Sequence, residues 1–226
     1  WLSQLNDGAS SLYVHVPFCR TLCWYCGCHT WAISRSRPLD GYERGLMDEL
    51  RLVVAAGRPL HLSHVHWGGG TPTALGAQAI RAVMDELRRL CTVKTDAEIA
   101  IEIDPRVLGK ELAHALSEAG FNRASIGVQD FSPNVQKAVN RVQPFEQVQT
   151  AVRHLRAEGI ARINLDLMYG LPFQSPESIV ENVDQAVSLG PQRLALFGYA
   201  HVPWMKRHQR SEEHTSELQS RGLISY

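Results

Sequence analysis

Short apolar runs alternate along the chain with longer stretches in which apolar residues recur every three or four positions. The short runs are rich in aliphatic and β-branched residues and predict six strands, over residues 12–16, 63–67, 99–103, 124–128, 163–168 and 193–199. The longer stretches predict five amphipathic helices, over residues 42–56, 79–90, 109–120, 145–159 and 175–190. Gly120 and Gly159 are expected to end two of these helices, and Ser175 before Pro176 is expected to cap a third.

This alternation predicts an α/β fold of parallel β/α units, because parallel strands need a crossover connection. Several strands are nearly continuous apolar runs, which indicates that both faces of the sheet are covered. An open doubly wound sheet and a barrel or partial barrel both fit this order of elements. Polar residues follow or end five of the strands, whereas a doubly wound sheet would gather them at one switch point. The pattern therefore favours a barrel-like closure, with functional residues at the carboxyl ends of the strands.

The composition is that of a soluble globular domain. The chain has 226 residues, of which 44% are hydrophobic, and no apolar run approaches the ~18 residues of a membrane span. The 23 Lys and Arg residues balance the 23 Asp and Glu residues without a basic block, so nucleic acid is not an expected partner. The polar N-terminus lacks a signal-peptide pattern. We expect a cytoplasmic location, where clustered thiols favour metal or redox chemistry over structural disulfides.

Four of the five cysteines lie within ten residues, in the sequence CRTLCWYCGC that follows the first strand. Cys19, Cys23 and Cys26 have the spacing C-x3-C-x2-C. A structural zinc site commonly uses two separate pairs of ligands, and no second pair is present in the sequence, so zinc is the weaker interpretation. A [4Fe-4S] cluster can take three thiolates from one loop and leave its fourth iron open. Only Gly27 separates Cys26 from Cys28, so we expect Cys28 to line the cavity rather than bind the same cluster.

The motif CRTLCWYC resembles the cysteine signature of the radical S-adenosylmethionine (SAM) superfamily. Within that superfamily, a longer set of segments resembles the oxygen-independent coproporphyrinogen III oxidases: LYVHVPFCRTLCWYCGC, HWGGGTPT, EIDP, GVQDF, NLDLMYGLP and YAHVP. The likeness runs over residues 11–208. It implies a partial (β/α)6 barrel and a [4Fe-4S] cluster held by Cys19, Cys23 and Cys26, with the methionyl group of SAM on the open iron.

The same resemblance implies two SAM molecules per site and a set of SAM-binding residues. The set is Tyr13, Tyr25, Gly69, Gly70, Thr71, Glu102, Gln129, Arg141, Asp166 and Ala200. Without the family, each has an ordinary alternative: the glycine run can be a tight turn, Glu102 a solvated strand end and Arg141 a surface residue. Asp166 lies in an apolar strand, where a carboxylate needs a partner that offsets its desolvation. A structural hydrogen bond is the alternative there.

Aromatic and imidazole side chains near the first two strands have more ordinary interpretations. Tyr13 and Tyr25 flank the cysteine loop, and without the family they would be core aromatics. His15, His64 and His66 lie on or beside strands. We expect these histidines to be core or wall residues rather than metal ligands.

The implied function is that of a radical SAM oxidoreductase in haem biosynthesis. Two propionates of coproporphyrinogen III are decarboxylated oxidatively to vinyl groups, which gives protoporphyrinogen IX. A 5′-deoxyadenosyl radical starts this chemistry, so no catalytic side chain is assigned beyond a cavity role for Cys28. An electron donor is required, and the sequence does not identify it. A haem-binding chaperone on the same scaffold is the alternative, and the Cys-Gly-Cys ending favours the oxidase.

Three segments are expected along the chain. They are an N-terminal remnant at residues 1–10, a radical SAM core domain at 11–209, and a non-native tail at 210–226. From Arg210 the sequence RSEEHTSELQS has no apolar periodicity and resembles the translation of a sequencing adapter, with an ordinary polar tail as the alternative. A non-native tail would mean that the native chain continues beyond Gln209 and that its C-terminal part is missing here.

Overall fold

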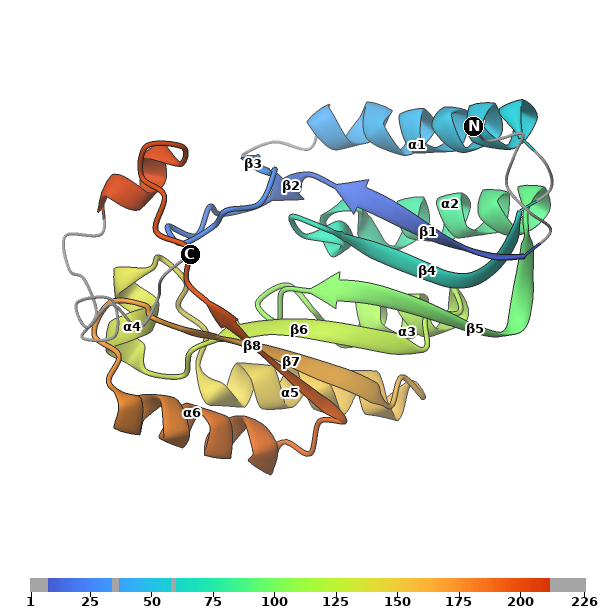
Figure 1. Ribbon diagram of the computed structural model, residues 1–226. Coiled ribbons are helices and arrows are strands. Elements are labelled where there is room, and N and C mark those ends of the chain that lie inside the picture. Colours follow the sequence, from blue (N-terminus) through green and yellow to red (C-terminus); the bar gives the residue numbers. More distant parts are fainter. Residues whose placement is uncertain (1–7, 34–36, 58–59, 212–226) are drawn as a thin grey trace.

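One sheet of six parallel strands forms the centre of the computed structural model, which describes residues 8–33, 37–57 and 60–211 (Figure 1). The strands are β1 (Ala9–Val16), β4 (His61–Gly69), β5 (Thr92–Ile103), β6 (Arg123–Gln129), β7 (Arg162–Tyr169) and β8 (Arg193–Gly198). Their order in the sheet is their order along the chain, from β1 at one edge to β8 at the other. A doubly wound sheet reverses its order at a switch point, so that alternative is excluded. The predicted α/β fold with a parallel sheet is confirmed.

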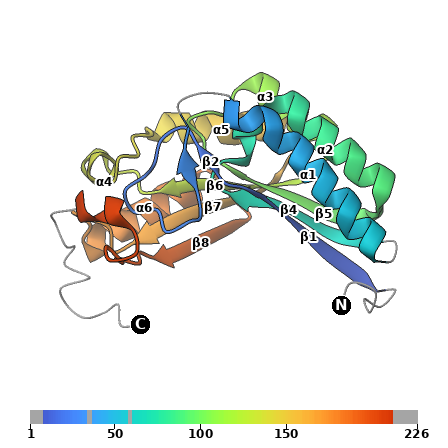
Figure 2. The ribbon, with the colours of Figure 1, turned by 90° about the horizontal axis from the view of Figure 1, so that it is seen from above.

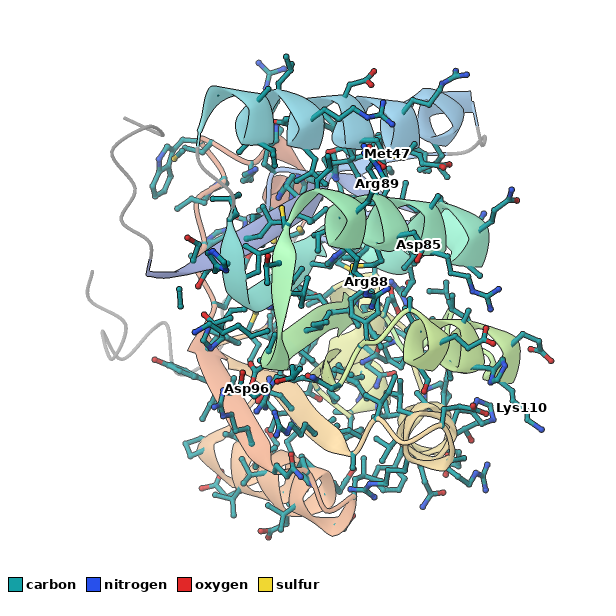
Figure 3. The ribbon with its side chains drawn as sticks, turned by 90° about the vertical axis from the view of Figure 1, so that its right-hand side faces the viewer. Met47, Asp85, Arg88, Arg89, Asp96 and Lys110 are labelled. Atoms are coloured by element: carbon teal, nitrogen blue, oxygen red, sulfur yellow. The ribbon has the colours of Figure 1, made fainter. Side chains whose placement is uncertain are left out.

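All five predicted helices are present, and they lie along one side of the curved sheet (Figures 2 and 3). They are α1 (Arg37–Ala56), α2 (Gly76–Leu90), α3 (Lys110–Glu118), α5 (Phe145–Ala157) and α6 (Pro176–Ser188). Right-handed crossovers that all advance in the same direction along a sheet place their helices on the same face. Charged side chains such as Asp85, Arg88 and Lys110 lie in this helical layer (Figure 3).

Short elements that the sequence pattern did not predict lie around the carboxyl ends of the strands. They are β2 (Phe18–Cys19), β3 (Trp31–Ala32), the 3-10 helices η2 (Pro72–Leu75) and η3 (Arg207–Ser211), and α4 (Pro133–Ala138). Strands β2 and β3 pair in parallel and enclose the cysteine loop between them. Each of these elements is too short to show an apolar period.

The hydrophobic core fills the space between the sheet and the helices. Val65, Trp67, Ile101, Ile126 and Leu165 point into it and are fully buried. On the opposite face the strand residues are polar and half-exposed, and β6 alternates strictly between buried and half-buried positions. The expectation that both faces are covered is therefore wrong for the described residues. The strand centres read as apolar runs, but their inner face carries the polar groups of the site.

The predicted helix ends are confirmed. Gly120 and Gly159 adopt positive φ values of 86° and 83°, a conformation that glycine reaches without a steric penalty. Ser175 forms a capping box with Ser178 at the start of α6: the Ser175 Oγ accepts from the Ser178 backbone N–H at 3.2 Å, and the Ser178 Oγ accepts from the Ser175 N–H at 2.9 Å.

Most of the predicted remnant and tail lies outside the described residues, which exclude 1–7 and 212–226. Of the parts that are described, β1 begins at Ala9 and η3 ends at Ser211. Among the described helices, none combines the length and the apolar character that crossing a membrane requires.

Candidate cofactor site

The cysteine loop leaves the end of β2 at Cys19 and returns to β3 at Trp31, at the carboxyl edge of the sheet (left in Figure 1). Two residues that follow α4 hold its first half. The Trp24 backbone N–H donates to the Val139 carbonyl at 3.0 Å, and the Asn140 side-chain amide donates to the Leu22 carbonyl at 2.9 Å. The loop is therefore tied to the end of β6 and α4, although more than 100 residues separate them in the sequence.

A cavity of about 260 Å³ lies beneath this loop, at the mouth of the sheet. It gathers most of the residues that the sequence predicted for the site: Cys19, Cys23, Tyr25, Cys26, Cys28, Gly69, Gly70, Thr71, Glu102, Gln129, Arg141 and Asp166. They come from the cysteine loop, from β4 to β7 and from the loops that follow these strands. Parallel strands that end at one edge of a sheet bring such distant groups together.

Tyr13 and Ala200 do not line this cavity. Tyr13 is 54% exposed on the inner face of β1, where its hydroxyl lies 3.1 Å from the His15 Nδ1 and its ring stacks on His66 at 5.8 Å. It is not a core aromatic. The Ala200 carbonyl accepts a hydrogen bond from the Gln209 side chain at 3.1 Å, just beyond the end of β8.

The three histidines lie on the open inner face of the sheet rather than in the core. His64 is exposed, and His15 and His66 are half-buried. Each has a neighbour: His15 Nε2 lies 3.0 Å from the His29 carbonyl, and His66 Nε2 lies 3.2 Å from Glu102 Oε1. They are wall residues, as one of the two expectations stated, and the core expectation is wrong.

Each of the three predicted ligand cysteines has a distinct environment. The Cys19 sulfur lies 3.3 Å from the Thr30 hydroxyl and accepts from the Thr71 hydroxyl at 3.5 Å. The Cys23 sulfur accepts from Arg141 Nη1 at 3.4 Å. A side-chain hydrogen bond between Cys26 and Cys28 raises the pKa of the Cys26 thiol and lowers the pKa of the Cys28 thiol. Because the two sulfurs share this bond, the first proton lost belongs to the pair.

The described residues contain no group of three His, Cys, Asp or Glu side chains that converges on one metal ion. A [4Fe-4S] cluster has a different requirement, since each thiolate binds a separate iron. Three thiols that line one cavity without meeting at a point fit that requirement.

Other features of the cavity also fit a bound cofactor. The Gln129 Oε1 is buried without a hydrogen-bond partner at the cavity wall, which leaves an acceptor for a ligand. Gln129 itself has a φ of 68°, uncommon for a residue with a Cβ, at an irregularity in the pairing of β6 with β7. Gly70 approaches the cysteine loop so closely that a Cβ there would lie 2.7 Å from the Phe18 carbonyl oxygen.

A buried ion network supports the Cys23 side of the cavity. Asp104 forms a salt bridge with Arg106 at 2.6 Å and with Arg141 at 3.5 Å. Burial alone would raise the pKa of the Asp104 carboxyl, but these two guanidinium groups lower the pKa below its ordinary value. Burial likewise opposes the charge of Arg141, yet Tyr25, Asp104 and Cys23 raise its pKa. Arg141 is therefore a buried cation and not the surface residue of the alternative reading.

Sequence reasoning did not assign Asp104 or Arg106 to the site, although the motif EIDP contains Asp104. It also missed Ser125, whose hydroxyl donates to Asp166 Oδ2 at 2.8 Å. The signal that could have found Asp104 is its position directly after β5, at the same edge as Glu102.

The two predicted acids differ in their surroundings. Glu102 accepts from the Gly69 backbone N–H at 3.2 Å, and its side chain is 40% exposed. Asp166 is bonded to Ser125 and to the Asn164 amide at 2.6 Å, so it has the partners that its position in an apolar strand demanded. Burial raises the pKa of Asp166, while these two hydrogen bonds act to lower it. Both carboxyls face the same cavity and offer acceptors for hydroxyl or ammonium groups.

The parallel fold and the thiol-lined cavity define a class of protein. The model of the radical SAM superfamily matches residues 13–186, most of the chain, and the chain belongs to this superfamily. Within it, the chain is 50% identical over 212 residues to the oxygen-independent coproporphyrinogen III oxidase of Bradyrhizobium diazoefficiens, which covers 93% of this chain and 47% of that protein. The enzyme of the same name from Paracoccus denitrificans is 46% identical and covers 92% of this chain and 47% of its own length.

The solved structures agree with the sequence relatives. A coproporphyrinogen III oxidase from Escherichia coli, described as a radical SAM enzyme, superposes with a TM-score of 0.88 at 40% identity, over 92% of this chain and 49% of that one. A second radical SAM structure, anSMEcpe with bound AdoMet, has a TM-score of 0.63 at 15% identity, and this likeness concerns the fold alone. The chain spans about half the length of the curated relatives it matches.

Proposed function

We propose that this chain is the radical-generating part of an oxygen-independent coproporphyrinogen III oxidase. Each of two propionate side chains of coproporphyrinogen III would lose CO2, one hydrogen atom and one electron and become a vinyl group, giving protoporphyrinogen IX. The observation that carries the proposal is the convergence of the C-x3-C-x2-C thiols, two carboxyls and an unpartnered amide oxygen on one cavity. The names of relatives that are 46% to 50% identical supply the substrate.

The cofactors of this proposal are a [4Fe-4S] cluster and SAM. Cys19, Cys23 and Cys26 would hold the cluster. When bound, the two groups supply a 5′-deoxyadenosyl radical that abstracts hydrogen from the substrate. The SAM contacts would come from the predicted residues that line the cavity, namely Tyr25, Gly69, Gly70, Thr71, Glu102, Gln129, Arg141 and Asp166. Tyr13 and Ala200 lie outside this cavity, so we assign them to the second SAM that the resemblance implies.

The side chains around the cavity would orient and polarise what they bind. The Arg141 cation, held by Asp104, would stabilise the Cys23 thiolate across 3.4 Å. Glu102 and Asp166 would accept hydrogen bonds from the ribose hydroxyls or the ammonium group of SAM. Gln129 Oε1 would accept one more. We expect the protein to act in the cytoplasm, where thiols stay reduced, with an electron donor that is still to be identified.

The test begins with anaerobic reconstitution of the chain with iron and sulfide. We expect a broad visible absorbance and about four irons per chain, the content of one such cluster. Cys19→Ala, Cys23→Ala and Cys26→Ala should each lose most of this iron. Cys91→Ala is the matched control, because Cys91 is a free cysteine buried in the core away from the cavity. Equal iron in all four variants would refute the ligand assignment.

The second stage tests the reaction. The reduced, reconstituted chain is mixed with SAM and coproporphyrinogen III, and 5′-deoxyadenosine, CO2 and vinyl product are measured beside the Bradyrhizobium relative as a positive control. The proposal requires all three products. Cleavage of SAM with haem binding and no vinyl product would reject the oxidase in favour of the haem-binding chaperone.

A further inference from the structure

The segment that follows β8 returns to the cysteine loop, and three of its side chains bind the loop backbone (red beside blue in Figures 1 and 2). Lys206 Nζ donates to the Cys28 carbonyl at 3.0 Å. His208 Nε2 lies 2.7 Å from the Cys26 carbonyl, an acceptor, so this nitrogen carries the proton. The Gln209 amide donates to the Tyr25 carbonyl at 3.1 Å. Three carbonyls at the second half of the loop are thus bound from one short segment.

Gln209 is the centre of this arrangement. It is fully buried, and its Nε2 also donates to the Ala200 carbonyl at 3.1 Å, while its Oε1 accepts from the Val202 backbone N–H at 2.6 Å. A buried amide is stable only when its donors and acceptor are paired, because an unpaired group loses the hydrogen bonds it made to water. The three bonds therefore fix the cysteine loop, the end of β8 and η3 relative to one another.

The second half of the cysteine loop has little structure of its own to hold it. Residues 20–30 contain no helix or strand, and their internal backbone bond runs from the Cys26 N–H to the Cys23 carbonyl at 3.1 Å. The contacts from Asn140 and Val139 hold the first half, before Cys26. A site that binds three metal atoms needs its ligands placed within a fraction of an ångström, so the second half needs support from elsewhere.

We propose that Lys206, His208 and Gln209 form a clasp that positions the cysteine loop before a cluster is bound. They are positioning residues, which act through the backbone of Tyr25, Cys26 and Cys28. The consequence for the cluster rests on the proposed function, but the order that the clasp gives to the loop does not. The two claims can therefore fail separately.

The direct test is hydrogen exchange by mass spectrometry on the cluster-free chain. Gln209→Glu keeps the shape of the side chain and replaces its two donated hydrogens with an acceptor that faces two carbonyls. Peptides covering residues 20–28 should exchange at least about tenfold faster in this variant, since each lost bond shifts a local opening equilibrium by roughly that factor. Peptides from β5 and β6 should not change. Gln185→Glu, on the exposed face of α6, is the matched control.

The partly exposed members of the clasp separate local loosening from unfolding. If Gln209→Glu unfolds the chain, Lys206→Met and His208→Leu decide the question, with Arg207→Met as the exposed control from the same helix. His208→Gln keeps a donor and should restore most of the protection. Loop exchange in Lys206→Met and His208→Leu equal to that of Arg207→Met would overturn the proposal.

A second measurement connects the clasp to the cluster. After reconstitution, iron should leave Gln209→Glu for a chelator at least about tenfold faster than it leaves Gln185→Glu, and the electron paramagnetic resonance spectrum of the reduced cluster should change. Equal rates and spectra together with equal loop exchange contradict the clasp. If the unaltered chain binds no iron but the loop still loosens in Gln209→Glu, the proposed function fails and the clasp stands.

Discussion

A buried guanidinium next to a cysteine sulfur is the main electrostatic feature of the site at the scale of residues. Arg141 lies 3.4 Å from the Cys23 sulfur and donates to the Gly127 carbonyl at 2.6 Å through its other nitrogen. Its charge is compensated by Asp104, which Arg106 binds from the opposite side. Removing one partner of such a network leaves a buried charge without compensation, which is more costly than the network itself is stabilising.

Asp104→Asn should therefore destabilise the cluster-free chain at pH 7, by about 3 kcal/mol. The Arg residues lower the pKa of Asp104 in the folded state. Its stabilisation is thus complete above its unfolded pKa, near 4, and is lost as the pH falls through the lower folded value. Urea denaturation should show a wide gap between the original and variant chains at pH 7 that narrows below pH 4. Asp184→Asn, on the exposed face of α6, is the control, and a gap independent of pH would contradict the prediction.

Gln129 combines an unfavourable backbone with an unpartnered amide, which indicates a trade between stability and binding. Its φ of 68° costs a residue with a Cβ about 1 kcal/mol relative to glycine. We expect Gln129→Gly to raise the free energy of unfolding of the cluster-free chain by about that amount. The same variant should weaken SAM binding to the reconstituted chain roughly tenfold, through loss of one hydrogen bond. Calorimetric titration and urea denaturation measure the two effects, and a variant that binds SAM normally would exclude Gln129 from the site.

At the scale of elements, the helices follow from local signals and the site does not. Apolar spacing and end signals predicted α1, α2, α3, α5 and α6, because each is long enough to show a helical period. The two-residue strands, the six-residue α4 and the 3-10 helices show no period, yet they hold the cysteine loop. Their positions are set by contacts between residues far apart in sequence, such as the bond from Asn140 to Leu22.

The capping box of α6 gives a prediction at this scale. Ser175→Ala removes the acceptor for the Ser178 N–H and should cost about 1 kcal/mol in the free energy of unfolding. Ser132 is a matched control, because it occupies the same position before a proline at the start of α4 but makes no side-chain cap bond. Ser132→Ala should cost clearly less. Equal losses in urea denaturation would mean that the capping bond does not contribute to stability.

For the whole molecule, the sequential strand order explains why one edge of the sheet carries the chemistry. Every crossover advances in the same direction, so the helices cover one face and the inner face stays open to polar groups (Figure 2). The sequence predicted this edge from the polar residues that end the strands. It could not predict the partners of those residues: the Asp104 and Arg141 pair spans 37 positions, and the clasp joins residues 206–209 to 25–28. Such pairs follow only from the folded arrangement.

Because the cavity joins the cysteine loop to four strands, a ligand bound there should stabilise the whole chain. SAM at about one hundred times its dissociation constant adds roughly 2.7 kcal/mol to the free energy of unfolding. For a chain of this length, that raises the midpoint of thermal unfolding by about 5 to 10 °C. The reconstituted chain and its Cys91→Ala variant should both show this shift in anaerobic calorimetry. Cys26→Ala should lose most of the shift, because SAM then has no cluster iron to bind. A full shift in Cys26→Ala would mean that SAM binds this cavity without the cluster, and the order of cofactor binding would have to be reversed.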